Sequence, residues 1–396
     1  MGTQTNRCSR RAGAIRPSAT LELSARAKAL AAAGEPVINL SAGEPDLPTP
    51  APVVEAAHRA LDDGRHFGYT AAAGVPPLRA SLAEIYAGRL GVGLAAENVV
   101  VTNGAKQALF NALSTCTDPG DRVGILAPYW VTYVEQTRAL GCEPVIVDCP
   151  ASGGFRPDLD ALDAALGDGL RVLILNSPGN PTGAAYARED FEAILDRVAA
   201  TDTLLVSDEI YEDIVFVDRG HVSPLHVRPD LAERTCVVSG FSKAFAMTGW
   251  RIGYSLAPAD WTKAMGALQG HTTSNINAIA QQAALEACRR HDLVAPMVEV
   301  FRGRRDRVVE HLESLPGVTA HTPEATFYLF MDVVERLGPG GYAPDVDAFC
   351  QRLLDEQQVV LVPGSAFGNP THARLSFAAS ESDLDAAFDR LRTAFS

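Results

Sequence analysis

A lysine with unusual neighbours marks the part of the chain that most clearly suggests chemistry. Lys243 follows Ser242 at the end of an apolar run, and Arg251 comes eight positions later in the string S-G-F-S-K-A-F-A-M-T-G-W-R-I-G-Y, residues 239–254. The string holds only one other charge, so a solvated surface lysine explains it poorly. A lysine amine can form a Schiff base with an aldehyde cofactor, and an arginine near a hydroxyl suits a phosphate group.

An acid and a tyrosine close a second apolar run. Asp208 ends the stretch L-L-V-S-D at 204–208, and Tyr211 follows three residues later. Ligands of an α/β sheet bind at the carboxyl ends of the strands, so this acid stands in a suitable place. Helix capping explains many such aspartates, and the pair carries weight only together with other motifs.

Three further segments could bind a phosphate or an aromatic ring. The loop N-S-P-G-N-P-T-G at 176–183 contains Asn180 and is more specific than an ordinary Asn-Pro turn. Gly104, Ala105 and Lys106 open a predicted helix, where backbone N–H groups and the helix dipole attract a phosphate. Trp130 stands in P-Y-W and could be either a core residue or a stacking face for a ring.

An arginine in an apolar strand suggests an anion site. Arg374 lies in A-R-L-S-F at 373–377, where a buried charge without an anion would be costly. A planar guanidinium binds a carboxylate through two parallel hydrogen bonds, so a substrate carboxylate is the natural partner.

Together, in this order along the chain, the motifs closely resemble those of the class I/II aminotransferases of fold type I, which depend on pyridoxal 5′-phosphate (PLP). The resemblance covers about residues 18–377. It implies an L-amino acid and a 2-oxo acid as substrates, with Lys243 as the catalytic residue that holds PLP as an internal aldimine. The cofactor-binding residues that it implies are Gly104, Ala105, Lys106, Trp130, Asn180, Asp208, Tyr211, Ser242, Lys243 and Arg251, with Tyr69 from the partner of a homodimer. The substrate-binding residues that it implies are Gly43, Trp130, Asn180, Arg374 and Lys106.

The choice of substrate follows from the branch of the family. The segments around Lys106 and Trp130 resemble those of bacterial and archaeal aspartate aminotransferases, in which a lysine at this position meets the distal carboxylate. Arg16, Ser18 and Thr20 fall in the strap that closes over that carboxylate, and some relatives also accept prephenate. Lys106 could instead be a solvated lysine in the first helical turn or a neighbour of the phosphate.

The sequence departs from the family pattern at several positions. Gly270 stands where relatives have a serine or an arginine, Ile276 replaces a proline, and Ala325 replaces a glycine. Gly240 stands where many relatives have a phosphate-binding serine, which leaves Ser242 and Arg251 as side-chain donors. The departures leave the PLP residues intact but put the preference for dicarboxylates in question.

Two other functions remain open at this stage. The first is another PLP reaction on the same scaffold, such as a lyase or γ-replacement reaction on an S-adenosylmethionine-like substrate, as ACC synthases illustrate; those enzymes tend to have a tyrosine at the position of Trp130. The second is a non-catalytic regulator, for which the roughly 20 residues before Leu21 are too few to form a DNA-binding segment.

The pattern of apolar runs predicts an α/β fold. The sequence predicts a short strand at 36–40 and a long charged helix at 294–315. Between them, short continuous runs of Val, Ile and Leu at 99–102, 122–127, 143–147, 172–176, 203–207, 235–239 and 252–256 alternate with helical stretches. Such runs are typical of a mostly parallel sheet with both faces covered. The resemblance adds fold type I, with seven strands in the large domain. We expect an N-terminal arm and part of the small domain at 1–50, a large PLP-binding domain at 51–290, and a smaller α+β domain completed by 291–396.

Composition narrows the function classes. The net charge of −14 argues against nucleic acid or an anionic membrane as a partner. Seven scattered cysteines without a CxxC pair suggest free thiols in a reducing cytoplasm, and the nine histidines show no metal-binding spacing. No apolar run approaches the ~20 residues of a membrane span, and the basic start lacks the apolar region of a secretory signal. We expect a cytoplasmic enzyme without a metal.

Overall fold

The centre of the molecule is a seven-stranded, mostly parallel sheet, as the sequence predicted. The computed structural model describes residues 8–17 and 19–395. The strand order is β2-β8-β7-β6-β5-β3-β4, and β8 alone runs antiparallel to its two neighbours. The strands are β2 (Val99–Thr102), β3 (Arg122–Ala127), β4 (Glu143–Asp148), β5 (Val172–Asn176), β6 (Leu204–Asp208), β7 (Thr235–Gly240) and β8 (Gly253–Leu256).

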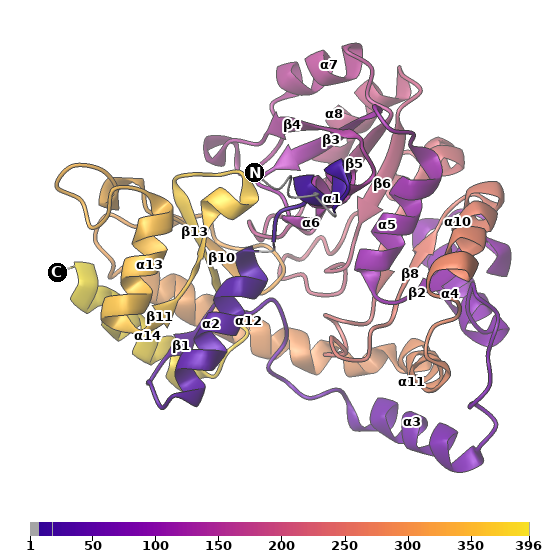
Figure 1. Ribbon diagram of the computed structural model, residues 1–396, viewed down its shortest axis with the longest axis horizontal. Helices are drawn as coiled ribbons and strands as arrows, with labels where there is room; N and C mark the ends of the chain where they lie inside the picture. The colour runs from indigo at the N-terminus through magenta and orange to yellow at the C-terminus, as the bar shows by residue number, and fades with distance from the viewer. Residues whose placement is uncertain (1–7, 18, 396) are drawn as a thin grey trace, which may run out of the picture.

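Helices cover both faces of this sheet, which explains why its inner strands are apolar throughout (Figure 1). On one face, α5 (Ala105–Cys116), α6 (Thr132–Ala139) and α10 (Ala259–Thr272) bury residues such as Leu109 and Met265 against the strands. On the other face, α7 (Leu159–Gly167) and α8 (Arg188–Ala199) bury Phe191 and Ile194. Central strands such as β3, β5 and β6 therefore contribute apolar side chains to two cores, and the parallel strands end at one common edge.

A second, four-stranded antiparallel sheet lies beside the first. Its order is β12-β13-β10-β9, with β9 (Thr319–Ala320), β10 (Tyr328–Asp332), β12 (Val362–Pro363) and β13 (His372–Ser376). The N-terminal strand β1 (Ile38–Asn39) pairs in parallel with β11 (Val359–Val360), so a segment from the first tenth of the chain pairs with one from the last tenth. The nearby helices are α2 (Ala19–Ala32), α12 (Ala295–Leu312), α13 (Val346–Gln357) and α14 (Glu381–Phe395). The division of the chain into domains at residues 50 and 290 stays a prediction.

The remaining helices complete the cover of the large sheet. Helices α3 (Ala51–Asp63), α4 (Pro76–Leu90) and α11 (Ala278–Arg289) pack on one another, while α1 (Arg10–Ala14) contacts α6. The short helix α9 (Pro224–Val227) lies near α8. None of the helices in the described ranges combines the length and the apolar character that crossing a membrane requires.

Two elements are shorter than the sequence suggested. The expected helix at 294–315 ends at Leu312, because Pro316 disfavours helical conformation in the residue before it and Gly317 adopts a left-handed φ of 65°. The expected strand at 36–40 is reduced to two paired residues, since its partner β11 is equally short.

Candidate active site

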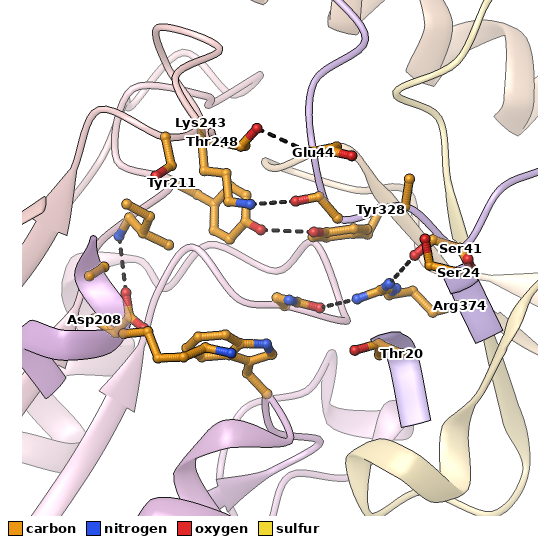
Figure 2. Close-up of a pocket in the computed structure, with 18 of the residues that line it drawn as sticks. Thr20, Ser24, Ser41, Glu44, Asp208, Tyr211, Lys243, Thr248, Tyr328 and Arg374 are labelled. Carbon is orange, nitrogen blue, oxygen red and sulfur yellow. Dashed lines mark hydrogen bonds between the residues drawn. The ribbon is translucent and has the colours of Figure 1, made fainter. Parts of the chain in front are cut away.

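The predicted site residues gather at one cavity of about 500 Å³ beyond the carboxyl ends of β5, β6 and β7. Parallel strands deliver their last residues to the same edge, which brings segments far apart in the sequence together. Figure 2 shows side chains from both sheets and from α2 pointing into this space. The predicted residues that line the cavity are Thr20, Gly43, Ala105, Lys106, Trp130, Asn180, Asp208, Tyr211, Ser242, Lys243, Arg251 and Arg374.

Asp208 is the last residue of β6 and is held firmly at the cavity wall. Its Oδ2 accepts a hydrogen bond of 2.8 Å from the Tyr133 hydroxyl, and its Oδ1 accepts one of 3.2 Å from the backbone N–H of Ile210. The amide of Asn176, at the end of β5, donates to the Asp208 carbonyl at 2.9 Å and ties the two strand ends together. Burial raises the pKa of Asp208 to about 6, since an ionised carboxylate loses hydration there. A cationic ligand group would recover that cost.

Lys243 extends into the cavity from the turn after β7. Its Nζ donates a hydrogen bond to the carbonyl of Gly43, which belongs to the segment between the two sheets. Burial, with the positive charge of Arg374 as the second cause, lowers the pKa of Lys243 to about 8. Roughly a tenth of the amine is therefore neutral and nucleophilic at pH 7, far more than for a lysine with its ordinary pKa.

Arg251 is a cationic part of the cavity wall, and its guanidinium lies in close contact with Gly104. The Arg251 guanidinium donates to the carbonyls of Thr248 at 2.8 Å and Asn103 at 3.3 Å. A Cβ at Gly104 would lie 2.5 Å from Arg251 Nη2, and the φ of +80° at Gly104 also favours glycine. Gly104 does not itself line the cavity, but its lack of a side chain lets Arg251 reach the start of α5, where Ala105 and Lys106 do line it.

Arg374 is buried on β13 without a carboxylate partner among the described residues. It is 2% exposed, and it donates to Asn180 Oδ1 at 3.0 Å and to the Ser41 carbonyl at 2.7 Å. Its Nε is buried with no hydrogen-bond partner in the described part of the chain. The guanidinium lies 4.4 Å from the centre of the Tyr328 ring, and burial lowers the pKa of Arg374. A buried cation with only neutral partners is suited to receive an anion.

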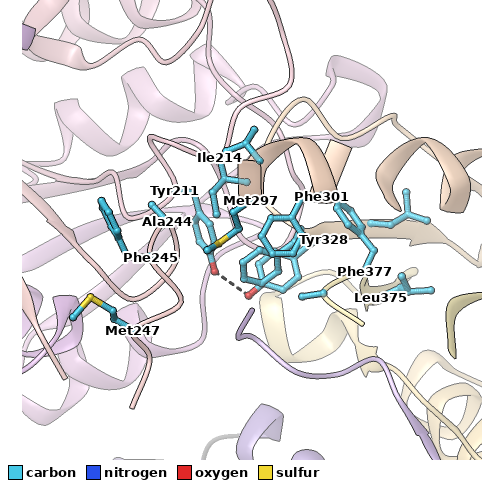
Figure 3. Close-up of a cluster of buried hydrophobic side chains, with 14 of the residues drawn as sticks. Tyr211, Ile214, Ala244, Phe245, Met247, Met297, Phe301, Tyr328, Leu375 and Phe377 are labelled. Carbon is cyan, nitrogen blue, oxygen red and sulfur yellow. Dashed lines mark hydrogen bonds between the residues drawn. The ribbon is translucent and has the colours of Figure 1, made fainter. Parts of the chain in front are cut away.

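Tyr211 links the wall of the cavity to the second sheet. Its hydroxyl lies 2.9 Å from the hydroxyl of Tyr328, and the rings meet edge to face (Figure 3). Met297, Phe301 and other apolar side chains pack around the pair. Burial raises the pKa of Tyr211 well above its ordinary value, so the phenol stays protonated and able to donate.

Lys106 and Trp130 line the part of the cavity where the resemblance places the distal carboxylate of the substrate. Lys106 Nζ lies 5.0 Å from the centre of the Trp130 ring, and no carboxylate pairs with this lysine in the described ranges. Burial, followed by repulsion from Arg251, lowers the pKa of Lys106. Of the strap residues, Thr20 lines the cavity, Arg16 lines an adjacent groove, and Ser18 lies outside the described residues.

Tyr69 does not reach the cavity of its own chain. Tyr69 is 95% exposed and lines a separate surface groove with Thr273, Ser274 and Asn275. The four departures from the family pattern, Gly240, Gly270, Ile276 and Ala325, also stay outside the cavity lining.

Sequence reasoning missed several side chains of the site. Tyr133, which donates a hydrogen bond to Asp208, lies in α6, and a tyrosine in a helix gives no sign of such a contact. Tyr328 lies three residues after Ala325, one of the departures from the family pattern. A tyrosine in an apolar strand gives no sign that its hydroxyl forms a hydrogen bond in the site. Ser24, Lys28 and Glu44 also line the cavity, and they are ordinary surface types whose role depends on tertiary contacts.

Comparison with known proteins agrees with this arrangement. Residues 35–391 match the family model for aminotransferase class I and II. An aspartate aminotransferase of Streptomyces avermitilis is 42% identical over 98% of this chain and 96% of its own length. An aspartate/prephenate aminotransferase of Thermus thermophilus is 42% identical over 96% of this chain and 97% of its own.

A solved structure gives the same result for the fold. The aspartate aminotransferase from Thermus thermophilus with maleate superposes with a TM-score of 0.92, at 41% identity, over 98% of this chain and 99% of the other. Family model, full-length relatives and fold therefore agree. The chain belongs to the aminotransferase class I and II family.

Proposed function

We propose that the protein exchanges an amino group between aspartate or glutamate and 2-oxo acids, with PLP attached at Lys243. The observation that carries the proposal is the grouping of three side chains in one cavity: the Lys243 amine, the buried Asp208 carboxylate and the buried Arg374 guanidinium. These groups match an aldehyde, a protonated ring nitrogen and a carboxylate respectively. The family relationship supports the same choice.

The residues fit PLP on observations of this chain. Asp208, whose pKa burial raises to about 6, gains from a cationic pyridine nitrogen, and Tyr211 and Asn180 have polar atoms near Lys243 in the same cavity. Arg251, Ser242 and the start of α5 offer donors for the phosphate, with the absence of a Cβ at Gly104 leaving room for the guanidinium. Trp130 would cover one face of the ring.

Bound PLP supplies an electron sink that stabilises negative charge at the substrate Cα. The protein side of the reaction would fall to Lys243, whose amine would move a proton from the substrate Cα. Its pKa of about 8 suits this task, because a general base works best with a pKa near the operating pH. Asp208 would hold a negative charge beside the ring nitrogen of the cofactor.

Substrate recognition is proposed to use two cations at different ends of the cavity. Arg374 would bind the α-carboxylate through two parallel hydrogen bonds, with Nε among the donors available, and Asn180 would hold the guanidinium in place. Lys106 would meet the distal carboxylate of aspartate or glutamate. The relative solved with maleate, a dicarboxylate, is consistent with this choice.

Reductive trapping tests the attachment. The purified holoenzyme should absorb visible light, and borohydride should fix the cofactor on the peptide that contains Lys243. Lys243→Ala should still bind PLP through Asp208 and Arg251 but lose turnover by several orders of magnitude, and Lys263→Ala, an exposed lysine of α10, serves as the matched control. Label on any other lysine would sink the proposal.

We also propose a homodimer with shared active sites. Tyr69 is 95% exposed in a single chain and Phe67 is 69% exposed, which is unusual for aromatic side chains of one loop in an isolated subunit. Mixed subunits of Tyr69→Phe and Lys243→Ala should form hybrids in which one site lacks both changes. Those hybrids should show a higher kcat/KM than the Tyr69→Phe homodimer, and a fully active monomer at micromolar concentration would contradict the proposal.

Acceptance of prephenate is a second candidate, favoured by the name of the Thermus thermophilus relative. Glutamate as donor with prephenate as acceptor gives a direct assay. Turnover at a kcat/KM near that for 2-oxo dicarboxylates would support it, and no detectable product would reject it.

A further inference from the structure

A buried group of ionisable side chains lies directly behind Asp208, on the side away from the cavity. Glu209 follows Asp208 in the chain and is 0% exposed, and Glu212 and His221 lie beside it. The ligand atoms of these three residues are within 4.8 Å of one another. Ionisable side chains that are buried this close together need partners of opposite charge, because an isolated buried charge is costly.

Every carboxylate oxygen of the group already has a partner. Glu209 Oε1 accepts from the hydroxyls of Ser207 at 2.7 Å and Ser223 at 2.8 Å, and its Oε2 lies 2.7 Å from His221 Nε2. Glu212 Oε1 accepts from Tyr86 and from Ser239, and its Oε2 lies 3.2 Å from Arg89 Nη1. The group therefore has the contacts of a proton-binding network, and a metal ion would have to displace them.

The positive charges are unevenly distributed. Arg89 pairs with Glu212 at 3.2 Å and with Asp213 at 3.3 Å, and His291 also contacts Asp213 at 3.0 Å. Glu209 has no lysine or arginine partner in the described ranges, so His221 is its one source of positive charge there.

A neighbouring histidine cannot take that role. His226 Nδ1 accepts a hydrogen bond of 2.9 Å from the backbone N–H of Ser223, and its Nε2 lies 2.8 Å from the Arg89 carbonyl, to which it must donate. These partners require one protonated and one unprotonated ring nitrogen, so His226 is neutral. Its ring lies 6.4 Å from that of His221, which leaves His221 to carry the charge.

We propose that His221 is a protonated counter-ion of Glu209 that neutralises the carboxylate next to Asp208, and so keeps Asp208 ionised for the ring nitrogen of the cofactor. The inference rests on the proposed function. His221 touches neither cofactor nor substrate, so it is a positioning residue that acts through Glu209.

The electrostatics of each group agree with this assignment. Burial alone would lower the pKa of His221, but the hydrogen bond and the charge of Glu209 outweigh it and raise that pKa above the ordinary value. Burial, together with repulsion from Asp213, raises the pKa of Glu212 to about 7. The charge of Glu209 is among the causes that raise the pKa of Asp208, so a neutralised Glu209 favours ionised Asp208.

The first experiment measures the charge of His221 directly in the apoenzyme. With ¹⁵N-labelled histidine, the ring signal lost in His221→Gln identifies His221. In wild type this signal should titrate above the ordinary value of about 6.5, and in Glu209→Gln it should titrate at a lower pH than in wild type, because the main effects that oppose burial are then lost while the charges of Glu212 and Asp213 remain. A wild-type His221 that titrates at or below 6.5 overturns the proposal, whether or not the enzyme binds PLP.

The second experiment measures the pH dependence of PLP affinity in reconstituted apoenzyme. Binding of a protonated ring requires ionised Asp208, so affinity falls on the acid side at the pKa of that carboxyl. His221→Gln leaves Glu209 unbalanced and should move this acid limb upward by about one pH unit, the scale of a unit charge acting over roughly 10 Å at an effective dielectric constant near 20.

Two further variants distinguish the effect of losing the His221 charge from a structural effect of the substitution. In the double variant Glu209→Gln/His221→Gln both charges are absent, so the acid limb should return to the wild-type position even if overall affinity is lower. His226→Gln, which removes a neutral ring, should leave the limb unmoved. An unmoved limb in His221→Gln, or the same shift in the double variant, would overturn the proposal.

Discussion

Two buried arginines, Arg304 of α12 and Arg374 of β13, differ in what surrounds them. Arg304 is 7% exposed and forms two parallel hydrogen bonds, of 2.6 and 2.9 Å, with the carboxylate of Asp46. Arg374 is 2% exposed, and its partners are an amide oxygen and a backbone carbonyl. Each leaves its Nε without a partner in the described part of the chain.

The difference distinguishes an arginine whose charge is balanced within the fold from the arginine that we propose binds the substrate. The charge of Arg304 is balanced within the fold, where it ties the segment between the two sheets to α12. The charge of Arg374 is not balanced by any carboxylate in the described ranges, and it faces the cavity that also holds Lys243. An unbalanced buried cation costs free energy in the unliganded protein, and a ligand carboxylate would recover that cost.

The largest expected effect comes from Arg374→Lys. This change keeps the charge but removes the planar fork, so kcat/KM should fall roughly 10- to 100-fold for every amino donor, the scale of hydrogen bonds to a charged group. Steady-state kinetics with aspartate, glutamate and an aromatic donor would measure it. A loss confined to dicarboxylates would instead assign Arg374 to the distal end of the substrate.

Lys106→Ala should have a narrower effect. Without the distal cation, kcat/KM for aspartate and glutamate should fall by roughly tenfold, equivalent to about 1.4 kcal/mol, while neutral and aromatic donors should be almost unaffected. Equal losses for all donors would make Lys106 a phosphate neighbour, as the alternative interpretation of its sequence position holds. The cavity would then contain one substrate-binding cation, Arg374, rather than two.

Arg304→Met should have the smallest effect on catalysis and a clear effect on stability. It leaves the Asp46 carboxylate without its partner, so the free energy of unfolding should fall by about 1–3 kcal/mol, with kcat/KM changed less than about threefold.

Arg374→Met is the matched control for stability. It should lower the stability of the ligand-free protein less than Arg304→Met does, since it leaves two neutral acceptors, Asn180 Oδ1 and the Ser41 carbonyl, without a partner but no carboxylate. Denaturant unfolding of both variants measures the contrast, and equal destabilisation would remove the distinction between the two arginines.

The sequence predicted the large sheet well because buried parallel strands are continuous apolar runs, and such runs are local. All seven strands of the sheet lie where the pattern put them, within a residue or two at each end. The exact helix and strand ends were harder to predict, as at 36–40, because they depend on a pairing partner far along the chain.

For the site, the motifs indicated residue types at strand ends, and the structure brings most of those side chains to one cavity. What the motifs could not indicate were partners joined only by tertiary contact. Tyr133 with Asp208, Tyr328 with Tyr211, and Asp46 with Arg304 are pairs of this kind. Their residue types carry no signal, since a tyrosine or an aspartate is equally common elsewhere on a protein.

The most direct test of the account is a single half-reaction. The holoenzyme is mixed with L-aspartate without an acceptor, and the visible absorption of the cofactor and the released products are followed together. We expect the visible band to convert to that of the pyridoxamine form, with one equivalent of 2-oxo acid released per site and no free ammonia. An unchanged band with aspartate and glutamate, or products of elimination in place of the 2-oxo acid, would contradict the assignment of this chain as an aspartate-type aminotransferase.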